Sequence, residues 1–246
     1  MFLCLWTYNP HYPFEAPEEL IQKYKGREGR GLRNPVYGGQ IEATDRAVGR
    51  VLDEVDRLGI ANRTVVVFTS DNGGSSGATD NHPLRSGKAD LFEGGIRVPL
   101  IIRWPGVTQP ESTVNDPVIS MDLTATVLDA AGVKLAEKET LDGQTLRPLL
   151  EGQETKRRYL FFHYPHFAWH KSNRPGAAIR DGNHKLILRF DDNSIELYDL
   201  AVDIRERNDL AKEKPGLGNK LRRRLEAWLV ETGARRPTPR KATPRR

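Results

Sequence analysis

The chain has 246 residues, of which 37% are hydrophobic and 29% charged, as is usual for a globular protein of one large domain. No apolar run approaches the roughly 20 residues that span a bilayer, so the sequence predicts no transmembrane segment. The net charge of +5 comes from residues 235–246, which hold six basic residues and no acid; without them the charge is −1, and no interleaved aromatics indicate nucleic-acid binding. The single cysteine, Cys4, excludes a disulfide framework and a cysteine-based zinc site.

The first residues predict a strand that leads into a rigid turn. The run FLCLWTY indicates a short strand within residues 1–8, and His11 follows it in a turn between Pro10 and Pro13. A histidine in such a turn is often only solvated. One that follows a buried strand, however, stands where active-site groups gather in α/β sheets. Residues 16–39 are polar and glycine-rich and predict a loop with a short helix.

The next two elements form a helix followed by a strand. Apolar residues at helical spacing predict an amphipathic helix over 40–58, and the run at 65–68 predicts a strand buried on both faces, as in a parallel sheet. Asp71 and Asn72 come directly after this strand, where ligands bind in open α/β sheets. Their oxygens suit Ca²⁺ or Mg²⁺, although an Asp-Asn-Gly-Gly turn needs no ligand.

A glycine-rich loop connects this strand to a second apolar strand at 98–104. The loop gathers four charged side chains, Arg85, Lys88, Glu93 and Arg97. Fixed cations between two buried strands indicate an anion site beside the candidate metal site. Lys88 taken alone would be a solvated lysine, whereas Arg97 is expected to pair with Glu93 and to have a structural role.

The remainder predicts a helix and then a small antiparallel sheet with a final helix. Ser120 is a candidate N-cap for a helix over 121–131. Alternation between turns indicates strands at 159–163, 177–189 and 194–198, and a last amphipathic helix covers 216–231. The three histidines His163, His166 and His170 are a weak zinc signal, because no finger or helical context supports them. A loop or substrate contact is the favoured interpretation there.

Three motifs in order resemble the type I, formylglycine-dependent sulfatases of the alkaline phosphatase-like superfamily. These motifs are SDNGG at 70–74, PLR-x-GK at 83–88 and EGG-x-R-VP at 93–99, and the PH-x-P turn around His11 agrees with them. The resemblance extends to about residue 233 and covers only the C-terminal half of such an enzyme.

The resemblance implies the fold and its divisions. We expect an α/β fold, a partial sulfatase sandwich with a mostly parallel sheet flanked by helices and a small C-terminal antiparallel sheet plus helix. Residues 1–155 would form the C-terminal part of the catalytic domain, 156–234 the C-terminal subdomain, and 235–246 a disordered basic tail.

The resemblance also implies the site. Asp71 and Asn72 would bind Ca²⁺, or alternatively Mg²⁺, while Lys88 and His11 would be catalytic. His166 and Arg174 are expected to reach a sulfated sugar from the C-terminal subdomain, an expectation based on loop position alone.

The nucleophile of the family, a formylglycine made in a C/S-x-P-S-R motif, does not occur in these 246 residues. We therefore expect a sulfuric ester hydrolase whose nucleophile lies in an N-terminal half missing from this chain, which would be inactive alone. The alternatives are a non-catalytic protein that binds a sulfated glycan, and a phosphatase or phosphodiesterase of the same superfamily. The family pattern implies a periplasmic or secreted protein, but the sequence itself leaves the compartment open.

Overall fold

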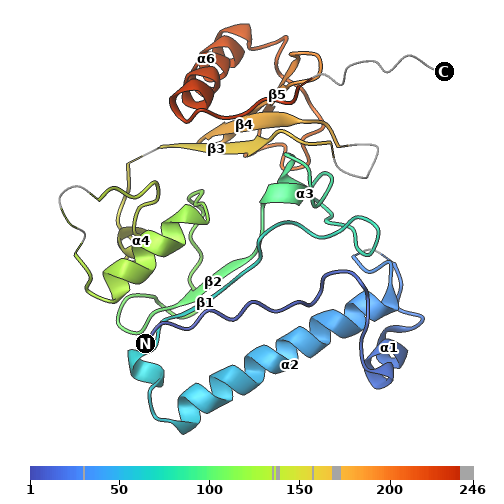
Figure 1. The fold of residues 1–246 in the computed structure, drawn as a ribbon, viewed down its shortest axis with the longest axis vertical. Helices are drawn as coiled ribbons and strands as arrows, with labels where there is room; N and C mark the ends of the chain where they lie inside the picture. The colour runs from blue at the N-terminus through green and yellow to red at the C-terminus, as the bar shows by residue number, and fades with distance from the viewer. Residues whose placement is uncertain (30, 135, 137–138, 157, 168–172, 239–246) are drawn as a thin grey trace.

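The computed structural model describes residues 1–238 except 30, 135, 137–138, 157 and 168–172 (Figure 1). His170 and residues 239–246 of the predicted tail therefore lie outside the described residues. The elements in chain order are α1 (Glu18–Tyr24), α2 (Pro35–Arg57), the 3₁₀ turn η1 (Ala61–Arg63), β1 (Val66–Thr69), α3 (Glu93–Ile96), β2 (Leu100–Arg103), α4 (Met121–Ala130), α5 (Arg147–Leu150), β3 (Tyr159–Tyr164), β4 (Gly176–Asp181), β5 (His184–Arg189), β6 (Ile195–Asp199) and α6 (Pro215–Glu231). This is the expected combination of an α/β part with a small antiparallel sheet and a helix.

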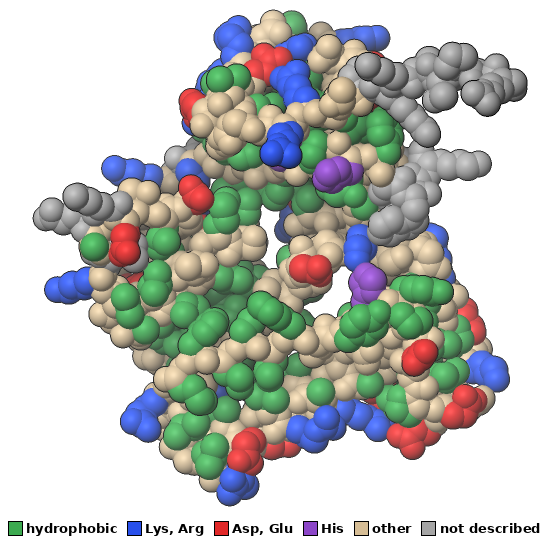
Figure 2. Space-filling view, viewed as in Figure 1, with side chains coloured by type: hydrophobic (Ala, Val, Ile, Leu, Met, Phe, Trp, Pro, Cys, Tyr) green, Lys and Arg blue, Asp and Glu red, His purple; other side chains and the backbone are tan. Residues whose placement is uncertain are grey.

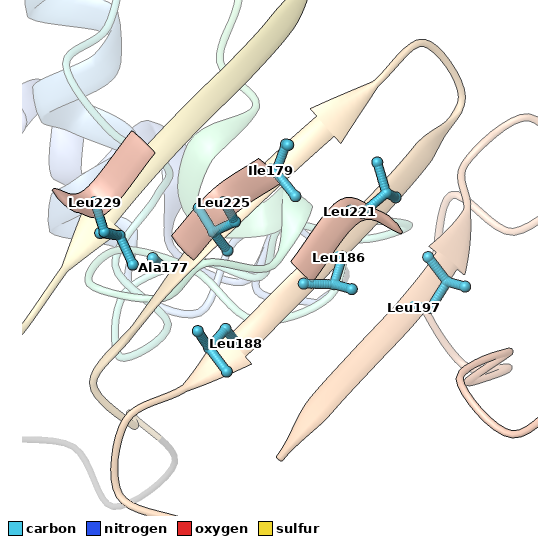
Figure 3. Packing of buried hydrophobic residues seen from close by; sticks show 8 residues of the cluster. All are labelled: Ala177, Ile179, Leu186, Leu188, Leu197, Leu221, Leu225 and Leu229. Atoms are coloured by element: carbon cyan, nitrogen blue, oxygen red, sulfur yellow. The ribbon is translucent and has the colours of Figure 1, made fainter. Parts of the chain in front are cut away.

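Strands β3 to β6 form an antiparallel sheet in sequence order, with Leu186 opposite both Ile179 and Leu197. Helix α6 lies across one face of this sheet (Figure 1). Leucines at helical spacing on α6 meet side chains of alternate strand positions, and together they form the largest apolar cluster (Figure 3). The cluster contains Ala177, Ile179, Leu186, Leu188, Leu197, Leu221, Leu225 and Leu229.

The opposite face of the same sheet is also covered. Ala178, Ile187 and Tyr198 point away from α6 because successive strand residues face opposite sides. They pack against Leu91 and Phe92, which belong to the loop just before α3. The sheet therefore lies between its own helix and the glycine-rich loop that follows β1.

Strands β1 and β2 form a separate two-stranded sheet, and their pairing is antiparallel. The parallel pairing expected for β1 is thus not found among the described residues. The expected burial on both faces is wrong as well, since Phe68 is 41% exposed and Ile101 63% exposed. Two strands alone cannot cover the apolar side chains of both faces.

The predicted strand at residues 1–8 is also wrong. This segment runs as an extended chain but pairs with none of the described strands (Figure 1). A strand needs a neighbour to accept and donate its backbone hydrogen bonds. Its large apolar side chains are exposed, with Phe2 at 72% and Trp6 at 92%. Figure 2 shows such apolar side chains gathered on the face that carries this segment and β1–β2.

Two helix starts differ from the expectation. Helix α2 begins at Pro35, five residues earlier than predicted, because Asn34 caps it by accepting a hydrogen bond from the Val36 amide. Ser120 makes no capping bond at α4; Asp122 instead accepts from the Ile119 amide over 2.9 Å. Of the helices in the described ranges, none is both long and apolar enough to cross a bilayer.

Candidate functional site

The long connection between β1 and β2 folds back on the end of β1. The Gly73 amide donates to the Gly95 carbonyl over 3.0 Å, and the Lys88 amide donates to the Gly74 carbonyl over 3.1 Å. A β-carbon on Gly73 would lie 1.7 Å from the carbonyl oxygen of Gly94, so only glycine permits this approach. Close backbone packing is therefore the reason for a glycine at this position. Lys88 is thereby held beside the end of β1.

Lys88 lies between two residues with unusual backbone conformations. Ser86 has φ 63° and Ala89 has φ 69°, in the left-handed region that side chains other than glycine seldom adopt. Asn81 holds this loop, since its side chain accepts from the Gly74 amide and donates to the carbonyls of Gly74 and Ser86, each over 3.0 Å. Backbone strain that its surroundings maintain is a mark of functional sites.

Asp71 and Asn72 lie at the end of β1, as the sequence predicted. Asp71 is exposed and Asn72 is half-buried, and neither side chain makes a hydrogen bond with another described residue. Within the described ranges no group of three or more His, Cys, Asp and Glu side chains could hold a metal ion. The donor chemistry of the pair suits Ca²⁺, but two side-chain oxygens are only a fraction of the 6–8 that Ca²⁺ prefers.

His11 is exposed and held by its own turn and by α2. Its amide donates to the Tyr8 carbonyl over 3.0 Å, and its Nδ1 lies 2.7 Å from the Tyr12 carbonyl oxygen. Because a carbonyl oxygen only accepts, Nδ1 carries the proton and Nε2 is left to act toward a ligand. The Nε2 group of Gln40 on α2, 1% exposed, donates to the His11 carbonyl over 3.2 Å. The sequence analysis missed Gln40, whose signal is a polar residue on the inner face of an amphipathic helix.

A buried ion cluster connects the Lys88 loop to the four-stranded sheet. Lys185 of β5 places Nζ 2.9 Å from Glu93 Oε1 and 2.7 Å from Glu206 Oε1, and all three side chains are at most 1% exposed. Glu206 Oε2 accepts from the Glu93 amide over 2.6 Å. Arg97 and Arg180 each lie 3.6 Å from Glu93 Oε2, so the expected pairing of Arg97 with Glu93 is confirmed.

The two carboxylates of this cluster respond differently to burial. Burial favours a raised pKa for Glu93, but the nearby charges of Lys185, Arg180 and Arg97 outweigh it, and the pKa is lowered. Burial dominates at Glu206, so its pKa is raised in spite of Lys185. Sequence spacing predicted the pairing of Glu93 with Arg97 but not the contacts with Lys185 and Glu206, which lie 92 and 113 positions from Glu93 and meet it only through tertiary folding.

The two residues expected to reach a sugar have contacts in the C-terminal part. Arg174 donates two hydrogen bonds to Asp191, over 2.7 and 2.8 Å, and lies 2.7 Å from Asp192. The hydrogen bond that Arg174 donates to Asp191 is the main reason that the pKa of Arg174 is raised. His166 is exposed, and its ring lies edge-on to Tyr164 with 5.7 Å between centroids. Their predicted contact with a sugar stays a prediction.

Comparison with known families gives two matches along the chain. The family described as "Sulfatase" matches residues 1–133, and the family described as "N-sulphoglucosamine sulphohydrolase, C-terminal" matches residues 87–232. The first match includes all three motifs of the glycine-rich connection. The second includes the Lys88 loop, the four-stranded sheet and α6.

Individual relatives agree with these families. A protein named "Sulfatase" from Formosa agariphila is 35% identical over 242 residues, covering 88% of this chain and 44% of the relative. Steryl-sulfatase of Rattus norvegicus is 34% identical over 230 residues, covering 78% of this chain and 39% of the relative. The solved structure of BT4656 with its substrate D-glucosamine-2-N,6-O-disulfate matches with a TM-score of 0.67 and 28% identity, covering 84% of this chain and 42% of that one. The chain spans less than half the length of each of these proteins.

Proposed function

Because this chain belongs to the sulfatase family, we propose that it supplies the metal-binding and sulfate-binding side chains of a sulfuric ester hydrolase acting on sulfated sugars. The observation that carries the proposal is the strained loop that holds Lys88 against the end of β1, where Asp71 and Asn72 lie. Support for a sugar substrate comes from the family described as N-sulphoglucosamine sulphohydrolase and from the disulfated glucosamine bound by BT4656.

In this proposal Asp71 and Asn72 would hold Ca²⁺, with Mg²⁺ as the alternative. One carboxylate and one amide oxygen at the end of a strand are hard donors of the kind these ions prefer, and neither is engaged by a described side chain. The cation, when bound, would offset the negative charge of the sulfate oxygens. Its other ligands would have to come from groups beyond this pair.

Lys88 and His11 would act on the ester itself. The ammonium group of Lys88 would bind a sulfate oxygen and oppose the charge that develops on the leaving oxygen as the ester bond breaks. With Nδ1–H directed at the Tyr12 carbonyl, Nε2 of His11 is the nitrogen that would carry a proton toward the leaving oxygen. Gln40 would act as a positioning residue, because it fixes the carbonyl of the His11 turn.

The nucleophile separates the proposal from its main alternative. The 246 residues contain no C/S-x-P-S-R motif, the motif in which sulfatases of this type form formylglycine. We therefore expect the 246-residue chain alone to bind sulfate esters without hydrolysing them. The same observation supports the alternative of a non-catalytic protein that binds a sulfated glycan. A phosphatase or phosphodiesterase is less favoured, because the matched family is that of the sulfatases.

Calorimetric titration of the purified chain with CaCl₂ tests the metal assignment. We expect Asp71→Asn to weaken Ca²⁺ binding by at least about tenfold, since it removes the only charged ligand of the pair. Asp53→Asn, at an exposed acid on α2, is the matched control and should leave the affinity unchanged. Equal affinities of the two variants would overturn the assignment. Hydrolysis of 4-methylumbelliferyl sulfate by the 246-residue chain would refute the expected inactivity.

A further inference from the structure

A second anion site is suggested by a cavity of about 670 Å³ that Asn81 helps to line. One wall is the loop at 80–86 and the opposite wall is the loop at 205–207. Arginines line it from three parts of the chain: Arg33, Arg85, Arg205 and Arg207. Arg85 belongs to the PLR-x-GK motif, but neither the motifs nor the proposed roles of Asp71 and Lys88 account for Arg33, Arg205 and Arg207.

The floor of the cavity is rigid. Glu206, which lies between the two rim arginines in sequence, adopts φ 53°, and its carboxylate is buried against Lys185. Its carbonyl accepts a hydrogen bond from the guanidinium of Arg85 over 2.7 Å. Arg85 also lies 3.7 Å above the Phe92 ring and donates to the Tyr198 hydroxyl over 3.1 Å. These contacts hold Arg85 in place within the lining of the cavity.

The rim carries cations with little to neutralise them. Arg205 and Arg207 are exposed, and neither guanidinium makes a hydrogen bond or ion pair with any described residue. Arg33 gives one hydrogen bond to the Ser76 carbonyl over 2.7 Å. The carboxylate that faces them, Asp80, already accepts from the amides of Gly31 and His82, and these bonds lower its pKa. The three guanidinium groups outnumber the single carboxylate of Asp80, which is already hydrogen-bonded, so the rim has a net positive charge.

The cavity and the Lys88 loop share a wall. Asn81 lines the cavity, and its side-chain amide is hydrogen-bonded to both the backbone N–H and the carbonyl of Gly74. The same carbonyl accepts a hydrogen bond from the backbone amide of Lys88. Asn81 therefore connects the cavity to the loop that carries Lys88. We propose that Arg33, Arg205 and Arg207 form a subsite for a second anionic group, sulfate or carboxylate, on the saccharide whose sulfate ester binds at Lys88. Guanidinium groups suit this task because they bind oxyanions in a bidentate manner.

This inference rests on the proposed function, and the experiment separates the two. The probe is a heparin-derived tetrasaccharide, titrated into the ¹⁵N-labelled 246-residue chain and compared with inorganic sulfate. We expect Arg205→Gln/Arg207→Gln to weaken tetrasaccharide binding by at least about tenfold, because two charge-assisted contacts are removed. The double variant Arg50→Gln/Arg223→Gln loses the same charge at exposed sites elsewhere, where no described residue forms an ion pair with either arginine, and should retain the affinity.

Each outcome has a defined meaning. Equal losses in the two double variants would show non-specific attraction and overturn the subsite, as would no loss in either. An oligonucleotide of equal charge that binds as tightly through the same arginines would overturn the saccharide class. If the rim arginines matter for the tetrasaccharide while Lys88→Ala changes binding of neither tetrasaccharide nor sulfate, the cavity stands as an anion site and the proposed function fails.

Discussion

Replacing Lys185 with methionine tests the buried cluster that holds the Lys88 loop on the sheet. The substitution keeps the length of the side chain but removes the charge between Glu93 and Glu206, whose carboxylates lie 2.9 and 2.7 Å from Nζ. Both carboxylates stay buried. Glu93 keeps two arginines at 3.6 Å, whereas among the described residues the Glu206 carboxylate keeps the hydrogen bond from the Glu93 amide.

The expected loss of stability at pH 7.5 is about 3–5 kcal/mol, the usual effect of leaving one member of a buried ion pair unpaired. The loss should shrink toward pH 5. In the native protein the lowered pKa of Glu93 gives stability that disappears as the pH falls through that value. The raised pKa of Glu206 has the opposite effect, because Glu206 binds a proton more readily in the folded protein than in the unfolded one. The stability that this carboxyl contributes to the protein is therefore lost as the pH rises through the raised pKa. Without Lys185 the pKa values of Glu93 and Glu206 both rise. Protonation of these carboxyls at lower pH therefore reduces the loss of stability in the variant.

Urea unfolding followed by tryptophan fluorescence measures this effect. Trp228 of α6 stacks on Phe161 of β3 with 4.7 Å between ring centroids, so its emission reports the packing of helix on sheet. Lys220→Met, at an exposed lysine of α6, is the matched control and should change stability by less than about 0.5 kcal/mol. A loss below about 1 kcal/mol for Lys185→Met at pH 7.5, or a loss equal at both pH values, would refute the reasoning.

Two further predictions concern glycines and the apolar cluster. Gly94→Ala should destabilise the chain and broaden the resonances of the Lys88 loop, because the new β-carbon would lie 2.3 Å from the Arg85 carbonyl oxygen. Gly49→Ala, within α2 and with open space around it, should instead raise the urea midpoint, equivalent to about 0.5–1 kcal/mol. Leu225→Ala should cost about 2–5 kcal/mol in the same assay, while Val230→Ala, 82% exposed, should have little effect; similar values for the last two would contradict the assigned packing.

Local patterns predicted the C-terminal part of the fold well. Helix α6 begins one residue before its predicted start, and α4 ends one residue before its predicted end. Periodicity depends on neighbours within a few positions, which the sequence displays directly. The segment 1–8 has equally strong strand composition, yet it is not a strand, because strand formation depends on a partner that no local pattern specifies. The direction in which β1 pairs could not be predicted for the same reason.

The candidate site residues stand in motifs, whereas the residues that support them do not. Lys88, Asp71 and His11 are assigned from motifs that resemble those of sulfatases, and their roles stay predictions. Gln40 and Lys185 have no motif, and they reach their partners only through tertiary folding. One signal for Lys185 does exist, since it opens the apolar run of β5, a strand that is buried along almost its whole length. A lysine in such a strand requires a buried carboxylate partner.

The second buried face of the C-terminal sheet, the face opposite α6, packs against the loop that carries Lys88. Left-handed backbone at Ser86 and Ala89 costs about 1–3 kcal/mol at each residue, and the loop cannot offset this cost by itself. Leu91 and Phe92 follow after Asp90, and burial of each on the sheet contributes about 1.5–3 kcal/mol. The two quantities are comparable, so the apolar contact with the sheet is sufficient to hold Lys88 in its strained loop. The face of the sheet opposite α6 thus supports the loop of the candidate site, and residues of β5 and β6 would influence Lys88, the proposed sulfate-binding residue, through this loop.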